Sequence, residues 1–73
     1  MIIITGPQST SDELEALDDV ASILNAVPAF SAALQWAVAT ALYCMAGWES
    51  CPLAVADVTI AEAFGLAVHY LSV

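Results

Sequence analysis

The sequence predicts an all-α fold: a small bundle of three helices, preceded by a short extended N-terminal arm, in a single domain over residues 1–73. Two observations predict it. Apolar residues recur at helical spacing along most of the chain. Prolines and glycines divide the chain into segments of ordinary helix length. The hydrophobic fraction of 62% includes many alanines, which suit close packing of helices.

The first helix is expected over residues 11–25. Thr10 followed by Glu13 matches a capping box, in which each side chain accepts a hydrogen bond from a backbone amide at the start of the helix. The apolar residues of this segment fall on one half of the helix. The other half carries four carboxylates, which are Asp12, Glu15, Asp18 and Asp19.

The second helix is expected over residues 29–46, between Pro28 and Gly47. Trp36 and Tyr43 project from a second side of it, as a further buried face or as a patch that binds a partner. Residues 29–48 carry no charge before Glu49 and are long enough to span a bilayer. Several polar residues and the lack of flanking basic residues argue against such a span.

The third helix is expected over residues 52–71. Thr59 with Glu62 matches a second capping box, so this segment could break near Asp57 and give four helices in place of three. Residues 1–4 are a short β-branched run that is too short to found a sheet alone. We expect it to lie as an arm against the helices or to pair with another copy.

The charge balance limits the partners of the chain. It has eight acidic residues, no Lys or Arg and a net charge of −8. That charge excludes direct binding to nucleic acids and to anionic membranes, and it favours basic protein surfaces or cations. The two cysteines, Cys44 and Cys51, could be bridged or reduced, and no signal peptide is visible. We therefore expect an intracellular protein.

No catalytic or metal-binding motif is present, so we predict no enzymatic activity, no metal and no cofactor. His69 is the only histidine, and with Cys44 and Cys51 it would supply three ligands at spacings unlike any common zinc module. The segment Gly6-Pro7-Gln8-Ser9-Thr10 superficially suggests a phosphate-binding loop, but it lacks the lysine and the glycine spacing.

The acidic pattern therefore carries the functional prediction. Five carboxylates over residues 12–19 give one charge per roughly 2–3 Å of helix. Duplex DNA carries one per about 1.7 Å. The alternative interpretation is a plain solubilising surface. We predict a non-enzymatic inhibitor that presents a DNA-like face to a basic nucleic-acid-binding protein. The candidate partner-binding residues are Asp12, Glu15, Asp18, Asp19, Glu49, Asp57 and Glu62.

The acidic stretch TSDELEALDDV, in a short chain without enzymatic motifs, resembles phage-encoded anti-CRISPR proteins in overall character. Some of these are small helical bundles that occupy DNA-binding surfaces. We expect a monomer or small homo-oligomer. The resemblance implies a phage or mobile-element protein that acts in the cytoplasm of a bacterial host. Its partner would be a CRISPR effector subunit that grips DNA.

Two other functions are open. An acidic leader helix followed by Ser, Thr and Cys residues is similar to the precursor of a ribosomally made, post-translationally modified peptide. No Gly-Gly or Gly-Ala processing site separates the two parts, which argues against it. A small oligomeric structural protein that uses Trp36 and Tyr43 is the third possibility.

Overall fold

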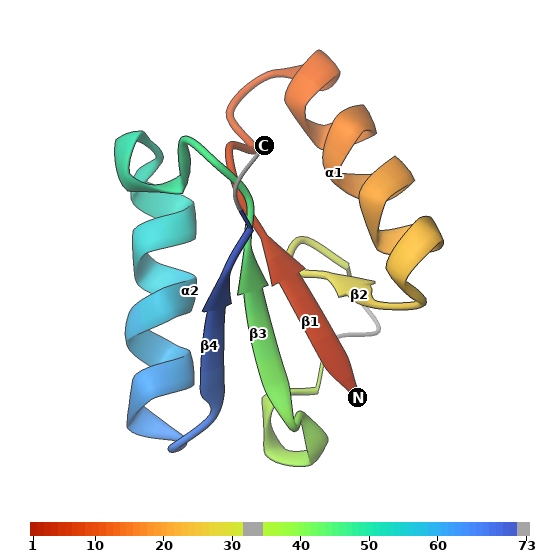
Figure 1. Ribbon diagram of the computed structural model, residues 1–73. Coiled ribbons are helices and arrows are strands. Elements are labelled where there is room, and N and C mark those ends of the chain that lie inside the picture. The colour runs from red at the N-terminus through yellow and green to blue at the C-terminus, as the bar shows by residue number, and fades with distance from the viewer. Residues whose placement is uncertain (32–34, 72–73) are drawn as a thin grey trace.

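The computed structural model describes residues 1–31 and 35–71 as an α/β fold with a four-stranded parallel sheet (Figure 1). The prediction of an all-α helical bundle is therefore wrong. The sheet has the order β2-β1-β3-β4, and one helix packs on each of its faces. In chain order the elements are β1 (Ile2–Thr5), α1 (Ser11–Leu24), β2 (Val27–Pro28), the 3-10 helix η1 (Trp36–Val38), β3 (Ala41–Cys44), the 3-10 helix η2 (Trp48–Ser50), α2 (Pro52–Ala63) and β4 (Ala67–Tyr70).

Strand β1 occupies the place where we expected an extended arm. It lies between β2 and β3, with Ile3 in register with both Val27 and Leu42. Ile3 and Ile4 are fully buried, as β-branched residues of an inner parallel strand usually are. The run is short, as the sequence indicates. It nevertheless becomes a sheet strand because its pairing partners come from segments far along the chain.

The helix expected over residues 29–46 is absent from the part of it that the structure describes; residues 32–34 lie outside the described residues. Ala41–Cys44 is a strand instead, and Val27–Pro28, which directly precedes the expected helix, is a strand as well. Leu42 and Cys44 are buried while their neighbours are half-buried, which is the alternation of a strand. Pro28 is placed on the edge strand β2, where a residue without an amide proton is tolerated.

The helix expected over residues 52–71 ends early. Helix α2 stops at Ala63, and Gly65 has a positive φ of 71°, which reverses the chain into β4. The alternative with a break near Asp57 is also wrong. Helix α2 runs through that position, and the Thr59 hydroxyl donates to the Val55 carbonyl within it.

The first helix is confirmed as α1, within one residue of its expected end. The Thr10 side chain accepts from the Glu13 amide, and the Glu13 carboxylate accepts from the Thr10 amide. Leu17 and Ala21 are buried on its inner side. Asn25 ends the helix in the left-handed conformation with φ of 54°.

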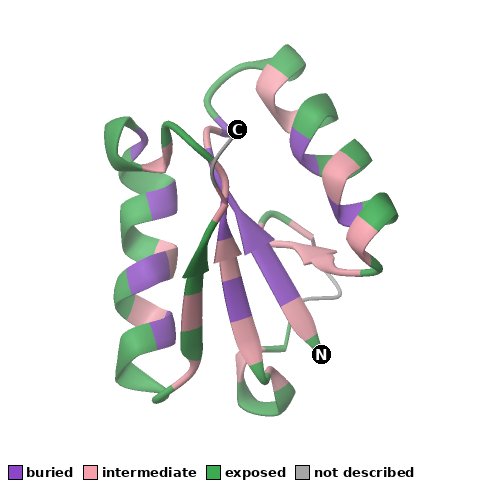
Figure 2. Ribbon diagram, in the orientation of Figure 1, coloured by how far each residue is buried: buried purple, intermediate pink, exposed green. Residues whose placement is uncertain are grey.

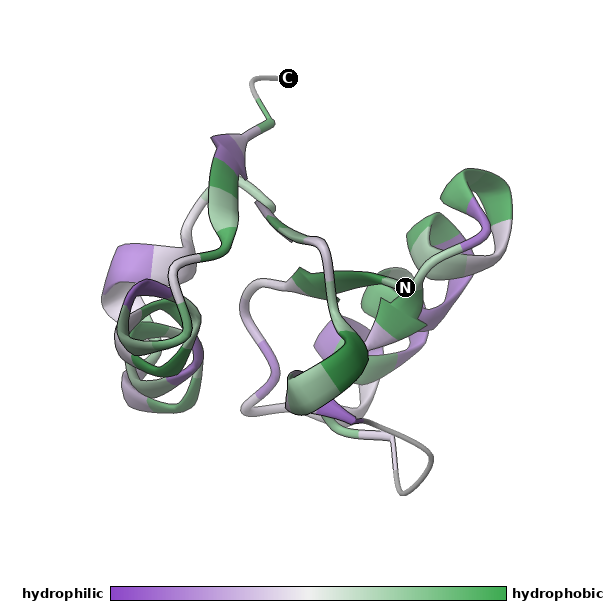
Figure 3. Cartoon of the chain, turned by 90° about the horizontal axis from the view of Figure 1, so that it is seen from below, coloured by the Kyte–Doolittle hydropathy of each residue, from purple (hydrophilic) through white to green (hydrophobic). Residues whose placement is uncertain are grey.

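Alternate residues of the strands supply two separate cores, one on each face of the sheet (Figure 2). On one face Ile4 packs with Leu17 and Ala21 of α1. On the other, Val58 and Ala61 of α2 pack with Ile3, Leu42 and Cys44. Viewed from below, Figure 3 shows the two helices on opposite sides of the molecule.

No helix within residues 1–31 and 35–71 is long and apolar enough to cross a membrane. The uncharged segment before Glu49, whose length raised that question, contributes β3 and two short 3-10 helices in its described part.

Candidate functional site

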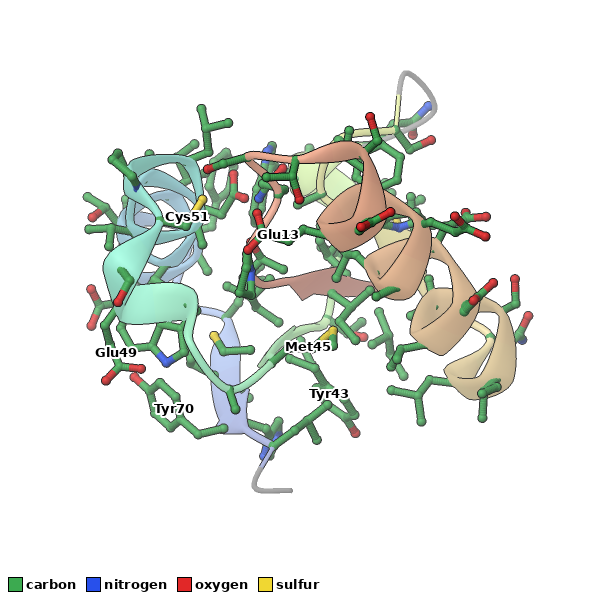
Figure 4. The ribbon with its side chains drawn as sticks, turned by 90° about the horizontal axis from the view of Figure 1, so that it is seen from above. Glu13, Tyr43, Met45, Glu49, Cys51 and Tyr70 are labelled. Carbon is green, nitrogen blue, oxygen red and sulfur yellow. The ribbon has the colours of Figure 1, made fainter. Side chains whose placement is uncertain are left out.

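The candidate site lies where the chain changes direction across the sheet. From β1 the chain crosses through α1 to β2 on one side, and from β3 it crosses through α2 to β4 on the other. The carboxyl ends of the adjacent strands β1 and β3 therefore feed loops that diverge. Ligands of open α/β sheets bind outside the carboxyl ends of the strands at such a point. Figure 4 looks down on the carboxyl ends of the strands, with α1 and α2 on either side of them.

The loops that follow β1 and β3 approach each other closely at the carboxyl ends of these strands. The Met45 amide donates to the Thr5 carbonyl at 2.8 Å, which extends the pairing of β1 and β3 by one hydrogen bond. A Cβ placed on Gly6 would lie 2.8 Å from the Cβ of Met45. Only glycine fits there without a shift of the neighbouring chain.

Three polar side chains form a hydrogen-bonded network beside these loops. Thr5 ends β1 and is fully buried, and Gln8 in the following loop is 7% exposed. The Thr5 hydroxyl donates to Oδ2 of Asp57 on α2 at 2.8 Å, and the Gln8 amide donates to the same oxygen at 3.1 Å. Gln8 is also 3.2 Å from the Thr5 hydroxyl oxygen. Two donors on one oxygen fix the orientation of the carboxylate.

The other oxygen of Asp57 is open. Oδ1 makes no hydrogen bond with the described residues, whereas every buried side-chain polar atom among them has a partner, so Oδ1 is exposed to solvent. Burial raises the pKa of Asp57, and the hydrogen bonds from Thr5 and Gln8 oppose that effect. The arrangement presents one free carboxylate oxygen that can accept a hydrogen bond or a proton, or contact a cation.

A thiol lies next to this network. Cys51 directly precedes α2, is 3% exposed, and places Sγ 3.6 Å from the Ser9 hydroxyl oxygen. Burial raises its pKa, but hydrogen bonds from Ser9 and from backbone amides that include Ala54 outweigh that effect and lower it. Figure 4 shows Cys51 on the side of α2 that faces α1.

The pKa of the Cys44 thiol is shifted in the opposite direction from that of Cys51. It is fully buried in β3, and burial followed by the charges of Asp57 and Glu49 raises the pKa of its thiol to about 11. Both cysteines are free thiols.

The structure separates the acidic residues that the sequence grouped together. Asp12, Glu15, Asp18 and Asp19 are all exposed on α1. Glu49 in η2 and Glu62 on α2 are also exposed, but they belong to the layer on the opposite face of the sheet. Asp57 is turned inward to Thr5 and Gln8. The acidic face is thus the α1 surface alone, defined by its four exposed carboxylates.

The aromatic residues are also on different faces. Trp36 is half-buried and packs against the core under α2, and Tyr43 packs against the core under α1. His69, exposed on β4, has its ring in edge contact with Tyr43 at a centroid distance of 5.1 Å. Trp36 and Tyr43 therefore form no joint patch.

Sequence reasoning missed Thr5, Gln8, Ser9 and Cys51 as site residues. A usable signal was present. A β-branched run, a Gly-Pro turn and a capping box follow one another over residues 2–13, which is the pattern of a strand that leads through a tight loop into a helix. The likeness of residues 6–10 to a phosphate-binding loop, which the missing lysine rules out, conceals this pattern.

The described residues enclose no pocket, so the site is an open surface at the carboxyl ends of β1 and β3. Among these same residues, no group of three or more His, Cys, Asp and Glu side chains is placed to hold a metal ion. Comparisons with protein families, with curated proteins and with solved structures find no match to the chain.

Proposed function

We propose that the chain is a binding domain for a small polar ligand, uncharged or cationic, at the carboxyl ends of β1 and β3. The observation that supports this proposal best is the presentation of Asp57. Its Oδ2 is held by Thr5 and Gln8 while its Oδ1 is left open at the switch point of a parallel sheet. If Asp57 had only a structural role, a neutral side chain with all its hydrogen bonds satisfied would serve as well. The free-energy cost of desolvating a carboxylate would then be avoided.

The charge of the chain defines the class of ligand. Phosphates and carboxylates are repelled, because no Lys or Arg is present and Asp57 itself is an anion when ionised. The open carboxylate oxygen accepts hydrogen bonds, and the site therefore suits a ligand with hydroxyl, amide or ammonium donors. Sugars, nucleosides and small amines belong to this class.

The proposal is tested by nuclear magnetic resonance titration of the ¹⁵N-labelled chain with a panel of sugars, nucleosides and amines, each paired with its phosphorylated counterpart. We expect an unphosphorylated member to shift the backbone amide signals of the non-proline residues within 5–9 and 51–57. Its phosphorylated counterpart should cause smaller shifts.

Two asparagine variants make the assignment specific. Asp57→Asn removes the open anionic oxygen and should weaken binding of the active ligand at least about tenfold, the effect of about 1.4 kcal/mol. Asp18→Asn makes the same change on the exposed surface of α1 and should leave binding unchanged. The proposal is wrong if no unphosphorylated member shifts the site, or if Asp57→Asn binds it as well as the unaltered chain.

A second candidate function is favoured by the α1 surface. Its carboxylates at positions 12, 15, 18 and 19 are all exposed, and the chain has no Lys or Arg to pair with them. Such a face is attractive to a basic groove built for DNA, as in an inhibitor of a nucleic-acid-binding complex in a bacterial cytoplasm. This candidate needs no pocket and uses none of the residues around Asp57.

The test of the second candidate is inhibition of DNA binding by a basic complex such as a CRISPR effector. Glu15→Lys with Asp19→Lys should abolish inhibition, and binding should weaken steeply with added salt. Glu49→Lys with Glu62→Lys changes the charge by the same amount on the opposite side of the sheet, and it should retain most of the inhibition. Equal effects of the two double variants would show that net charge, rather than the α1 surface, matters.

The modified-peptide precursor stays a prediction. Intact mass spectrometry of the protein from its host would favour it by showing dehydration or removal of a leader.

A further inference from the structure

Helix α2 is apolar on its outer side as well as on the side that packs on the sheet. Leu53, Val55 and Phe64 are 57%, 40% and 55% exposed, respectively. Ala56, Thr59 and Ala63 between them are exposed as well. We call the residues Leu53, Val55, Ala56, Thr59, Ile60, Ala63 and Phe64 the α2 outer face.

The polar groups of the α2 outer face do not depend on water for their hydrogen bonds. The Thr59 hydroxyl donates to the Val55 carbonyl at 3.0 Å, so it is satisfied within the helix and leaves its methyl group to the surface. Asp57 is turned inward, and Glu62 is the one carboxylate of α2 that remains exposed, at the rim of the face. Covering this face would therefore leave no hydroxyl or charge unpaired at its centre.

Helix α1 provides the comparison within the same molecule. Its exposed side carries four carboxylates, whereas the exposed side of α2 carries one, on the opposite face of the sheet. A basic partner would be drawn to α1. A second copy, which has the same net charge, meets less repulsion at the α2 outer face, where Glu62 at the rim is the one exposed carboxylate, than at α1.

The shape of the α2 outer face fits a second copy of itself. With about 3.6 residues per turn, Leu53, Ile60 and Phe64 form a ridge of large side chains along one flank. Ala56 and Ala63 form a row of small side chains beside it. When two such helices meet in antiparallel orientation about a two-fold axis, the ridge of each lies in the shallow row of the other.

We propose that the α2 outer face is a self-association surface, through which two copies form an antiparallel, two-fold symmetric dimer. A 12-residue helix is about 18 Å long. Two such helices alone bury less than the roughly 1,200 Å² at which standard stable interfaces begin. The dimer is therefore weak, and each copy keeps its α1 surface away from the other.

Sedimentation equilibrium between about 10 μM and 1 mM tests the proposal on the full chain. We expect a reversible monomer–dimer equilibrium that strengthens with added sodium chloride, because two bodies of charge −8 repel each other and salt screens that repulsion. This is opposite to the salt dependence expected for binding of a basic partner to the α1 surface, so the sign of the salt effect distinguishes self-association from that interaction.

Two exposed alanines supply the matched variants. Ala56→Glu places a charge at the centre of the α2 outer face and should raise the dimer Kd at least about tenfold. Ala16→Glu makes the same change on the exposed side of α1 and should change Kd less than about threefold. Circular dichroism of both variants establishes that they remain folded.

The proposal is overturned if the unaltered chain is monomeric at 1 mM in high salt, or if the two variants weaken the dimer equally. It is also overturned if the chain is monomeric and instead sediments with vesicles of phosphatidylcholine, with Ala56→Glu abolishing that binding. A lipid surface would then be the partner of the α2 outer face.

Discussion

Two hydrogen bonds to a single oxygen determine how Asp57 is presented. Thr5 and Gln8 both donate to Oδ2, and both are buried. The Gln8 amide also donates to the Thr5 hydroxyl and to the Gly6 carbonyl, so one network holds both donors in place. The same burial that fixes the donors removes water from the carboxylate and raises its pKa. The cost of ionising Asp57 in the folded chain can therefore be measured as a pH dependence of stability.

The first prediction concerns that pH dependence. Because the folded pKa of Asp57 lies above its unfolded value, folding takes up protons at this group, and its contribution to stability improves as pH falls through the folded pKa. We expect the unaltered chain to gain stability relative to Asp57→Asn as pH is lowered from 7 toward 4, measured by urea unfolding. The other seven carboxylates are common to both chains and cancel in the difference. A relative loss of stability on acidification would mean that the hydrogen bonds outweigh the burial.

The two thiols give the second prediction. In Cys44→Ser, the remaining Cys51 should ionise below the ordinary pKa of a thiol, because Ser9 and backbone amides donate to its sulfur. In Cys51→Ser, the remaining Cys44 should ionise only near pH 11. Ultraviolet absorbance of the thiolate against pH measures both. Coincident titrations of the two variants would contradict the assigned environments.

At the scale of elements, the unit formed by β1, its loop and α1 depends on the capping box. Thr10 and Glu13 satisfy two amide donors at the start of α1 and also hold the end of the site loop, since the Ser9 amide donates to Glu13 at 3.0 Å. The cap is therefore part of the support of the site as well as of the helix.

The third prediction compares two threonine substitutions. Thr10→Ala removes the cap and should destabilise the fold by about 0.5–2 kcal/mol. Thr59→Ala removes only a hydroxyl bonded within α2 and introduces a better helix former, so it should be neutral or slightly stabilising. Chemical unfolding of both variants at pH 7 makes the comparison. A smaller loss for Thr10→Ala than for Thr59→Ala would show that the capping box does not support α1.

The fourth prediction concerns the close approach of the two loops. Gly6→Ala places a methyl group against the Cβ of Met45, an atom next to the backbone that has little freedom to move. We expect a loss of about 1–3 kcal/mol in stability, as for other overpacking substitutions. Adding Met45→Ala shortens that side chain but keeps its Cβ, so it should not restore the lost stability. Full rescue by Met45→Ala would place the clash at the end of the Met45 side chain.

For the whole molecule, the absence of positive side chains is the dominant electrostatic fact. A charge of −8 on a compact chain of 73 residues opposes the folded state, because unfolding moves the carboxylates apart. No side-chain ion pair can offset this repulsion unless His69 is protonated.

The fifth prediction follows from this repulsion. The melting temperature at pH 7 should rise with sodium chloride between about 10 mM and 1 M, as the screening length shortens. The variant with Glu15→Gln and Asp19→Asn should melt higher at low salt and respond less to salt, since two of the crowded charges on α1 are gone. A melting temperature independent of salt would contradict this account.

The sequence predicts α1 and its exposed acidic side correctly, because capping and amphipathic spacing act within a few residues of each other. It does not predict β3. Residues 41–44 carry alanine, leucine and tyrosine at spacings that suit a helix as well as a strand, and the strand is selected by pairing with β1 and β4. The site is missed for the same reason, since Thr5 and Asp57 are 52 residues apart.

The sequence by itself determined two kinds of property. One is local, namely the first helix and its cap. The other is a sum over the chain, namely the net charge and, through it, the classes of anionic ligand that are repelled. The tertiary structure alone decided the rest. It turned an N-terminal run of β-branched residues into an inner strand, separated Glu49 and Glu62 from the acidic side of α1, and turned Asp57 inward to Thr5 and Gln8. Strand pairing and sheet packing join residues that are distant along the chain, and their free energy appears only when those residues meet.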